Sequence, residues 1–419
     1  MITKVCARNF RSIGERIELE LGAMTVLVGP NASGKSNVAD VLRFLSECVT
    51  TSLASAVAAR HGLRALRHGG VWAPSDVVLE VHIEREQGAG IWGFSLASSG
   101  DEDGVHVEQE RAVWFPGPAP DAAIRARIFE LIKRTSSTWT EEERTLYGIK
   151  QPGAAGGVLV DLGPPSFSTQ RAFDSLRLPL VHQRDALVAS AAGSEELDPF
   201  GVVIDELRRI AIYSLFPDVL RAPQLPDPSK PMSSKGSNWA SILRALDRSA
   251  WGTELVAALG RIAADIDEYR VTQAGGFLIP EFRHGLDTQG RERWHGAAQE
   301  SDGTLRVAAL LTALFQDPAP ALLGFEEPEL GVHPGAIPLL FDFLKEASTR
   351  SQILLTTHSP DLLDLVPIDD IRVVERRSGA TTVARVEERQ REIVRKRLMS
   401  TSDLLHAEGL RPEGSTSDG

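Results

Sequence analysis

Eight residues decide the fold of this 419-residue chain: Gly29-Pro30-Asn31-Ala32-Ser33-Gly34-Lys35-Ser36. They fit the pattern G-x-x-x-x-G-K-[ST], in which glycines let the backbone wrap a phosphate so that successive N–H groups point at it. The apolar run Met24–Val28 precedes them, and an apolar stripe predicts a helix over Ser36–Cys48. A phosphate-binding loop requires this strand–loop–helix context, because the N-terminus of a helix attracts anions. We therefore expect a phosphate site at this loop rather than a structural turn.

Two residues of this loop have the chemistry for a nucleoside triphosphate. Lys35 supplies a point charge for the β- and γ-phosphates, and the hydroxyl group of Ser36 is a ligand for Mg²⁺. ATP and Mg²⁺ are therefore the predicted cofactors.

A pair of glutamates follows a second apolar run, Ala321–Phe325. A buried strand that ends in Glu326 and Glu327 is costly unless a cation or water meets the two carboxylates. We expect Glu326 to hold Mg²⁺, directly or through a metal-bound water, and Glu327 to polarise the attacking water. The alternative is a solvated acidic turn. Glu329, two residues further on, could be a turn or interface residue.

A serine–glycine loop, Ser301-Asp302-Gly303-Thr304, stands 25 residues before Glu326 and precedes a predicted buried helix over Leu305–Phe315. A loop of this kind at a helix N-terminus is a second anion-binding device. One ATP cannot easily need two such devices from one chain, so the second is expected to serve a neighbour's nucleotide. An ordinary helix N-cap would explain the same residues equally well.

A histidine ends the predicted strand Ile353–Thr357. Ligands gather at the carboxyl edge of α/β sheets, which makes His358 a candidate sensor of the γ-phosphate or the attacking water. The alternative is a satisfied structural histidine. Ser359 beside it lacks the G-x-S-x-G context of a hydrolase nucleophile.

Together these motifs resemble those of the RecF/SMC/OLD-like AAA ATP-binding proteins, which are ABC-type ATPase heads. The resemblance rests on Asn9-Phe10-Arg11-Ser12, on the phosphate loop through Asn37, and on the strings that begin at Ser301, Glu326 and Thr356. It is close over the first 50 residues and over about Gln299–Asp364, and looser between them.

The resemblance implies an α/β fold, an ABC-type P-loop ATPase head in which a mixed sheet has flanking helices, with a helical insert between the Walker A loop and the signature. The implied catalytic residues are Glu327 and His358, the latter as the H-loop switch. The implied nucleotide-binding residues are Arg11, Asn31, Ala32, Ser33, Gly34, Lys35, Ser36, Asn37, Ser301, Gly303 and Thr304. The implied metal ligands are Ser36 and Glu326. Glu329–His333 resembles the D-loop, and Leu66–Gly69 lies where relatives enter the Q-loop region.

The resemblance also implies partners. The Ser301 signature reaches the ATP of a second copy, so an ATP-dependent homodimer or higher oligomer is expected. Only 61 residues follow His358, so no TOPRIM nuclease domain of the OLD type is expected there. The strings Asp101–Asp103 and Asp265–Asp267 do not resemble a nuclease metal site. We expect an ATPase that leaves any cutting to a separate nuclease or effector.

Three functions stay open at this point. The first is a dimerising ATPase switch in DNA repair or anti-phage defence. The second is a nucleotide-sensing scaffold with little turnover. The third is a transporter nucleotide-binding subunit, which the insert disfavours, as does a signature unlike Leu-Ser-Gly-Gly-Gln.

Composition limits the partners further. The net charge is −12, from 45 basic and 57 acidic residues, which argues against coating of nucleic acid but leaves local DNA binding possible. Two cysteines, Cys6 and Cys48, do not suggest a disulfide framework. Apolar runs such as Ala308–Phe315 are too short to cross a bilayer, so we expect a cytoplasmic protein without a membrane partner.

Four segments are predicted: an N-terminal ATPase lobe over 1–115, a mainly helical insert over 116–275, a C-terminal ATPase lobe over 276–411 and a disordered tail over 412–419. Strands are expected at Val77–Ile83, Ile91–Leu96 and Val105–Val113. Helices are expected in the insert at Asp121–Thr135, Asp198–Leu215, Trp239–Ser249 and Gly252–Tyr269.

Overall fold

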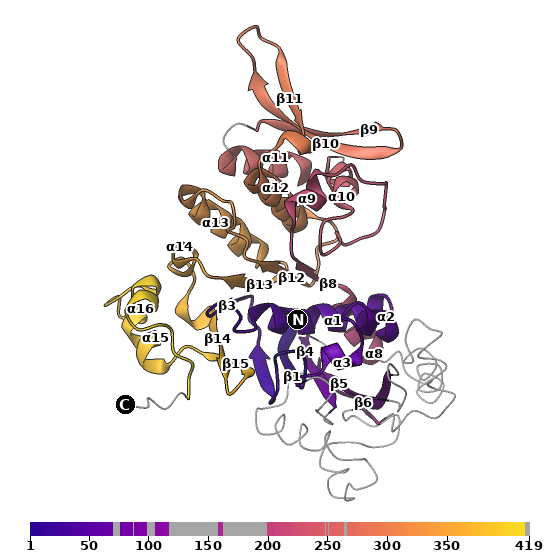
Figure 1. Cartoon of the computed structure of the whole chain (residues 1–419), viewed down its shortest axis with the longest axis vertical. Helices are drawn as coiled ribbons and strands as arrows, with labels where there is room; N and C mark the ends of the chain where they lie inside the picture. The colour runs from indigo at the N-terminus through magenta and orange to yellow at the C-terminus, as the bar shows by residue number, and fades with distance from the viewer. Residues whose placement is uncertain are drawn as a thin grey trace, which may run out of the picture. The chain divides into compact units, whose positions relative to one another are not determined.

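The structure is a computed structural model that describes residues 1–69, 76–86, 88–98, 105–116, 158–161, 199–247, 249, 251–263 and 266–414. The chain groups into two compact units (Figure 1). Unit 1 comprises Met1–Leu21, Asp40–Arg208 and Arg376–Thr382, and unit 2 comprises Gly22–Ala39, Arg209–Glu375 and Val383–Gly419. The segment boundaries 1–115, 116–275 and 276–411 stay a prediction. The predicted helix Asp121–Thr135 and the end of the tail from residue 415 lie outside the described residues.

Unit 1 is built on an antiparallel sheet whose described strands follow the order β2-β1-β4-β5-β6-β7. They are β1 (Ile2–Arg8), β2 (Ile17–Glu20), β4 (Val77–Arg85), β5 (Gly88–Ser98), β6 (Val105–Pro116) and β7 (Val158–Asp161). In β2, Ile17 and Leu19 are buried while Glu18 and Glu20 are exposed, as expected for a sheet with one covered face. The three strands predicted between residues 77 and 113 are confirmed as β4, β5 and β6.

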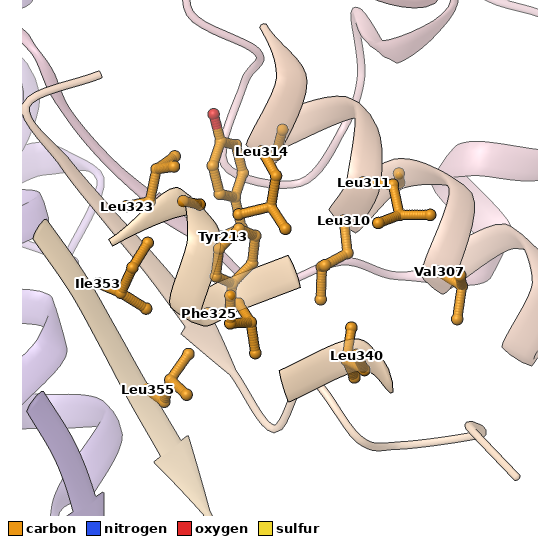
Figure 2. Close-up of a cluster of buried hydrophobic side chains, with 14 of the residues drawn as sticks. Tyr213, Val307, Leu310, Leu311, Leu314, Leu323, Phe325, Leu340, Ile353 and Leu355 are labelled. Atoms are coloured by element: carbon orange, nitrogen blue, oxygen red, sulfur yellow. The ribbon is translucent and has the colours of Figure 1, made fainter. Parts of the chain in front are cut away.

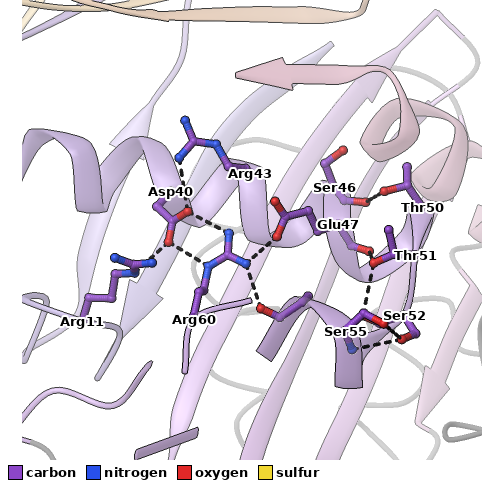
Figure 3. A network of polar contacts seen from close by, with 11 residues as sticks. Arg11, Asp40, Arg43, Ser46, Glu47, Thr50, Thr51, Ser52, Ser55 and Arg60 are labelled. Carbon is purple, nitrogen blue, oxygen red and sulfur yellow. Dashed lines mark hydrogen bonds and ion pairs between the residues drawn. The ribbon is translucent and has the colours of Figure 1, made fainter. Parts of the chain in front are cut away.

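A network of charges stabilises the helical part of unit 1 (Figure 3). Helix α1 (Lys35–Thr50) contributes its residues from Asp40 on, and α2 (Leu53–Ala58), α3 (Leu63–Leu66) and α8 (Pro199–Arg208) follow. The buried guanidinium of Arg60 donates from Nε and Nη2 to the Asp40 carboxylate, at 2.8 and 2.7 Å, and from Nη1 to Glu47. Buried charges persist only when they are paired, so this network holds the end of α2 against α1.

Unit 2 is built on a sheet with the described strand order β15-β14-β3-β13-β12-β8. Its strands are β3 (Met24–Val28), β8 (Ile210–Tyr213), β12 (Leu322–Glu326), β13 (Gln352–Thr357), β14 (Ile371–Arg377) and β15 (Ala380–Arg385). The end of β14 and the start of β15, within Arg376–Thr382, are grouped with unit 1. The ladders that join β14, β3, β13, β12 and β8 are all parallel. Every residue of β3, β8 and β13 is buried, which explains why these strands read as continuous apolar runs without alternation.

Two helices predicted in the insert are wrong in their second halves. The segment Asp198–Leu215 divides into α8, which ends at Arg208, and strand β8. The segment Gly252–Tyr269 divides into α11 (Trp251–Ile262) and strand β9 (Glu268–Ala274). Strand β8 is short, parallel and fully buried, so it has no alternating pattern that would separate it from the end of a helix. In the second segment the helix ends at Ile262, before the antiparallel strand β9 begins.

The core of unit 2 lies between the parallel strands and two helices, α12 (Asp302–Phe315) and α13 (Ile337–Ala347). Figure 2 shows leucines of α12 beside aromatic residues from two strands. The rings of Tyr213 on β8 and Phe325 on β12 stack with centroids 5.5 Å apart. The amide of Gln316 donates to the Tyr213 hydroxyl at 2.8 Å, so this buried polar group is satisfied.

Unit 2 contains further helices and strands besides this sheet and the helices α12 and α13. They are α9 (Pro217–Arg221), α10 (Trp239–Leu246), α11, β9, β10 (Phe277–Leu286), β11 (Glu292–Gly296), η3 (Ala297–Gln299), η4 (Pro334–Ala336), α14 (Pro360–Leu363), η5 (Ile368–Asp370), α15 (Glu388–Arg395) and α16 (Thr401–Ala407). Strands β11, β10 and β9 form an antiparallel sheet next to α10 (Figure 1). Among the described helices, none has both the length and the apolar character that a bilayer span requires.

Candidate functional site

The loop 29–36 joins β3 to α1 inside unit 2, and α1 begins at Lys35. Two glycines of this loop are required by its path. Gly34 has a φ of 107°, a region that side chains rarely adopt. A Cβ on Gly29 would lie 1.9 Å from the carbonyl oxygen of Val374, so only glycine fits so close to β14.

The side chain of Lys35 lies inside the curve of this loop. Its amino group donates to the carbonyl oxygens of Gly29 and Pro30, at 2.9 and 3.1 Å. Lys35 is only 6% exposed, and burial lowers the pKa of its amino group, an effect that the carboxylate of Glu327 opposes. The loop is therefore already folded around a cation, which suits it to an anionic ligand.

The other predicted loop residues differ in exposure. Asn31, Ala32 and Ser36 are exposed, Ser33 is buried, and Gly34 and Asn37 are half-buried. Ala32 has a φ of 62°, so a residue with a side chain takes up the left-handed region here.

The carboxyl ends of β3, β12 and β13 lie at one edge of the sheet. Across the ladders, Glu326 pairs with Thr356, and Thr357 pairs with Val28, the last residue before the loop. The same edge carries Ser214, directly after β8, whose hydroxyl donates to Glu326 Oε1 at 2.6 Å. The first acidic residue is thus oriented from a neighbouring strand, at the edge where ligands gather in such sheets.

Glu327 and His358 face each other at this edge, with 3.5 Å between Oε1 and Nε2. Glu327 has a φ of 48° and its N–H donates to the carbonyl oxygen of Thr356 at 2.9 Å, which turns the chain directly after β12. Burial lowers the pKa of His358, and the charge of Lys35 lowers it further, whereas Glu327 opposes both. Lys35, Glu327 and His358 therefore form one electrostatic group.

Glu329, which the sequence left as a turn or interface residue, supports the histidine. Its Oε1 accepts hydrogen bonds from the hydroxyl of Thr357 at 2.5 Å and from the N–H of His358 at 3.4 Å. Burial raises the pKa of Glu329, and these hydrogen bonds oppose that rise. The residue that precedes His358 and the histidine backbone are both held by this one carboxyl group.

The Ser301 loop caps α12. Ser301 is exposed, and its hydroxyl accepts from the N–H of Thr304 at 3.1 Å. The guanidinium of Arg221 contacts Asp302 at 2.6 Å. A Cβ on Gly303 would lie 2.1 Å from the carbonyl oxygen of Gly331, so the loop packs backbone to backbone against the segment that follows the glutamate pair.

Arg11 belongs to unit 1, whereas the site residues described above belong to unit 2. Its Nε is 2.7 Å from Asp40 Oδ2, and its main chain bonds to Leu66 and to the ring of His68. The contact of Arg11 with a nucleotide stays a prediction. The same two hydrogen bonds hold the Leu66–Gly69 stretch next to Arg11.

The sheet thus brings Lys35, Glu326, Glu327 and His358 to one edge, as the sequence predicts for strand ends. Sequence reasoning missed Ser214 and Thr356 and gave Glu329 no role in holding His358. Ser214 directly follows the short apolar run Ile210–Tyr213, and this position could have marked it as a residue at the end of a buried strand. The predicted helix Asp198–Leu215 included this run.

Most of this chain matches the model of a known protein family. A family model described as "AAA domain, putative AbiEii toxin, Type IV TA system" matches residues 24–151 and 238–364. The first stretch holds the phosphate loop, and the second holds the Ser301 loop, the glutamate pair and His358. The two matched stretches flank an insert.

Single proteins give weaker similarities. The chromosome partition protein Smc of Desulfitobacterium hafniense (strain Y51) is 44% identical over 45 residues, which is 10% of this chain and 4% of that protein. The SMC head domain from Thermotoga maritima superposes with a TM-score of 0.42 and 12% identity, over 92% of this chain and 99% of that one. The Smc head domain from Pyrococcus furiosus, solved bound to the C-terminal domain of ScpA, has a TM-score of 0.47 and 12% identity. That similarity covers 95% of this chain and 99% of the Smc chain.

Proposed function

This chain belongs to the AAA-domain family whose model it matches, and from that premise we propose that it is an ABC-type ATPase that binds and hydrolyses ATP with Mg²⁺. The observation that carries the proposal is the meeting of Lys35, Glu327 and His358 at the carboxyl edge of a parallel sheet. A phosphate loop and a carboxylate that can position water are recurring parts of sites that hydrolyse a triphosphate, and the imidazole lies at the same edge.

The loop 29–36 is the proposed cradle for the β- and γ-phosphates. The Lys35 amino group now bonds to two carbonyl oxygens of the loop, and it would turn to phosphate oxygens when the triphosphate is bound. Main-chain N–H groups at the start of α1, Gly34 among them, would complete the cradle, since helix N-termini favour anions. Asn31, Ser33 and Asn37 line the same stretch.

Ser36 and Glu326 fit a magnesium ion. Hydroxyl and carboxylate oxygens are ligands that Mg²⁺ prefers, and both residues lie at the ends of elements that converge on the loop. Bound Mg²⁺ neutralises charge on the β- and γ-phosphates. Ser214 orients Glu326 through the 2.6 Å hydrogen bond, so it is proposed as a positioning residue.

Glu327 is the proposed general base. Its carboxylate would accept a proton from the water that attacks the γ-phosphate, and His358, 3.5 Å away, would hold that water or a γ-phosphate oxygen. The lowered pKa of His358 keeps the imidazole neutral at neutral pH. A neutral ring both donates and accepts a hydrogen bond, which suits a group placed between water and phosphate.

The Ser301 loop is proposed to complete the nucleotide site of a second copy. Ser301 and Asp302 are exposed at the N-terminus of a 14-residue helix, and Gly303 holds the loop against the Gly331 segment. Ser301, Gly303 and Thr304 would then face the partner's γ-phosphate. Two composite sites would form in one dimer.

The biological role that fits this assembly is an ATPase component of a DNA-repair or anti-phage defence system that acts beside a separate nuclease or effector. The family description names a toxin–antitoxin system, which supports the defence alternative. A nucleotide-sensing scaffold with little turnover is the competing function, and steady-state turnover separates the two.

Hydrolysis is tested with wild-type protein, Lys35→Ala and Glu327→Gln in a phosphate-release assay. We expect Glu327→Gln to slow turnover about 10²–10⁴-fold, the usual range for loss of a general base, while nucleotide binding is kept. Lys35→Ala is expected to lose both turnover and binding. Lys345→Ala, on α13, is the matched control because it removes an ammonium group away from the loop. Turnover that persists in Lys35→Ala, or is undetectable in the wild type, contradicts the proposal.

A further inference from the structure

A second cluster of possible metal ligands lies in unit 2, directly before the Ser301 loop. His284 comes from β10, His295 from β11, and Glu300 follows η3. One nitrogen of each imidazole and one carboxylate oxygen all lie within 4.8 Å of one another. The two imidazole rings also lie close together, with centroids 4.5 Å apart and a tilt of 34° between their planes.

The geometry of the cluster is close to that of a transition-metal site. His284 Nε2 is 2.7 Å from Glu300 Oε1, and His295 Nδ1 is 3.7 Å from the same oxygen. Ligand atoms around a tetrahedral zinc ion, at bonds of about 2.0–2.1 Å, lie roughly 3.3 Å apart. The observed distances fall on both sides of that value, so small rotations of the side chains would accommodate an ion.

The chain is shaped to bring these three residues together. The register of β10 against β11 shifts between Arg283 and Leu286, which places His284 in an irregularity of the ladder. Such bulges re-aim side chains and often lie beside functional sites. After β11, the N–H of Gly296 bonds to the side chain of Gln299 and closes η3, which returns Glu300 to the histidines.

The three side chains differ in their exposure to solvent: one is buried and could hold an ion in place, and another is open enough to let an ion enter. The carboxylate of Glu300 is 4% exposed, whereas the ring of His295 is 42% exposed and leaves a path from solvent. Arg293 donates to the carbonyl of His284, and Arg221 donates to the carbonyl of Glu300 and to the carboxylate of Asp302.

A cluster in unit 1 shows what an unsuitable site looks like. Cys6, Glu80 and His82 also meet within bonding range of one ion, and all three are buried. There, however, the guanidinium of Arg16 donates to Cys6 Sγ at 3.0 Å and contacts Glu80 at 3.4 Å. A fixed cation already takes the position of the metal in that cluster.

We propose that His284, His295 and Glu300 form a binding site for a divalent transition-metal ion of the zinc type. Two imidazole nitrogens and one carboxylate oxygen form a ligand set that zinc accepts, with a fourth position left for water. The ion fixes Glu300, and through it the start of the Ser301 loop, to β10 and β11.

The test is a calorimetric titration of chelator-treated, full-length protein with Zn²⁺ in the absence of nucleotide. We expect one equivalent to bind to the wild type, and binding to weaken at least tenfold in His295→Ala. His406→Ala removes an exposed histidine on α16 and is the matched control, with binding unchanged. Lys35→Ala is expected to bind zinc as the wild type does, so the result does not depend on the ATPase proposal.

A Co²⁺ titration identifies the ligands. Cobalt bound to histidine and carboxylate gives weak visible bands without the strong near-ultraviolet absorption of a cobalt–thiolate bond, and His295→Ala should lose these bands. Circular dichroism of His295→Ala in chelator checks that the variant is folded. The proposal is overturned if the wild type binds no zinc, if His295→Ala binds it equally well, or if thiolate absorption dominates.

Discussion

Lys35, Glu327 and His358 influence one another's charge, which makes the site sensitive to each of them. Lys35 is buried and lowers the pKa of His358, while Glu327 acts on both residues in the opposite direction. Glu329 accepts a hydrogen bond from the backbone N–H of His358, so it also acts on the position of this residue. At the scale of residues, the site is therefore one coupled unit rather than a set of separate side chains.

The protonation of His358 gives a prediction about pH and stability. Its folded-state pKa lies below the ordinary value of 6.5, so between the two values the unfolded chain binds a proton that the folded chain does not. The contribution of His358 to the free energy of unfolding is fully present above pH 6.5. It is lost as the pH falls from 6.5 toward the lower pKa of the folded state. Thermal unfolding midpoints of the wild type and His358→Gln, measured in buffers above and below pH 6.5, should show a weaker pH dependence in the variant.

His406→Gln serves as the comparison, because it removes an exposed histidine. Equal pH dependence in the wild type and in His358→Gln would show that the ring does not titrate as the geometry indicates.

The elements of unit 2 are joined where glycine permits close approach. The Ser301 loop reaches Gly331 through Gly303, and the phosphate loop reaches β14 through Gly29. These contacts join elements that are distant in the chain, and in both of them main chain approaches main chain. The positions of the loops therefore depend on two residues that contribute no functional group.

Gly303→Ala tests this dependence. The new methyl group would lie 2.1 Å from the Gly331 carbonyl oxygen, so the loop must move away. We expect turnover to fall at least tenfold while ATP binding by the single copy stays within about twofold of the wild type. Gly296→Ala is the control, since a Cβ there meets nothing closer than 4.0 Å. Normal turnover in Gly303→Ala would argue against a role for this loop in hydrolysis.

The sequence predicted those elements whose signal is local. The phosphate loop, β3 and α1 are adjacent in the chain, so glycine positions and an apolar stripe predict them together. The hydrogen bond from Ser214 to Glu326 joins residues 112 positions apart, and no local pattern carries it. Strand β8 was read as helix because a short buried run lacks a period, and that error hid Ser214.

At the scale of the whole molecule, the proposed unit of function is two chains. Each copy has a net charge of −12, so the net charges of two copies oppose association, most strongly at low salt, and a bridging ligand would favour it. In the proposed dimer, a triphosphate held by Lys35 of one copy and Ser301 of the other would be such a bridge. Its removal by hydrolysis would let the copies separate.

Glu327→Gln should therefore trap the pair. In light scattering after gel filtration with ATP and Mg²⁺, we expect the variant to have twice the mass of one chain, and a single-chain mass without nucleotide. Adding Ser301→Ala to the trapped variant should shift it back toward the single chain. A trapped variant that stays a single chain at every ATP concentration would contradict the composite site.

The contact between Gly303 and Gly331 also has a consequence for timing. Only four positions separate Gly331 from Glu327, and no rotamer change can absorb movement where two main chains touch. A displacement at the reacting centre that moves Gly331 would therefore also move the loop. We expect departure of inorganic phosphate and separation of the two copies to follow one shared rate constant in stopped-flow records, rather than two successive phases.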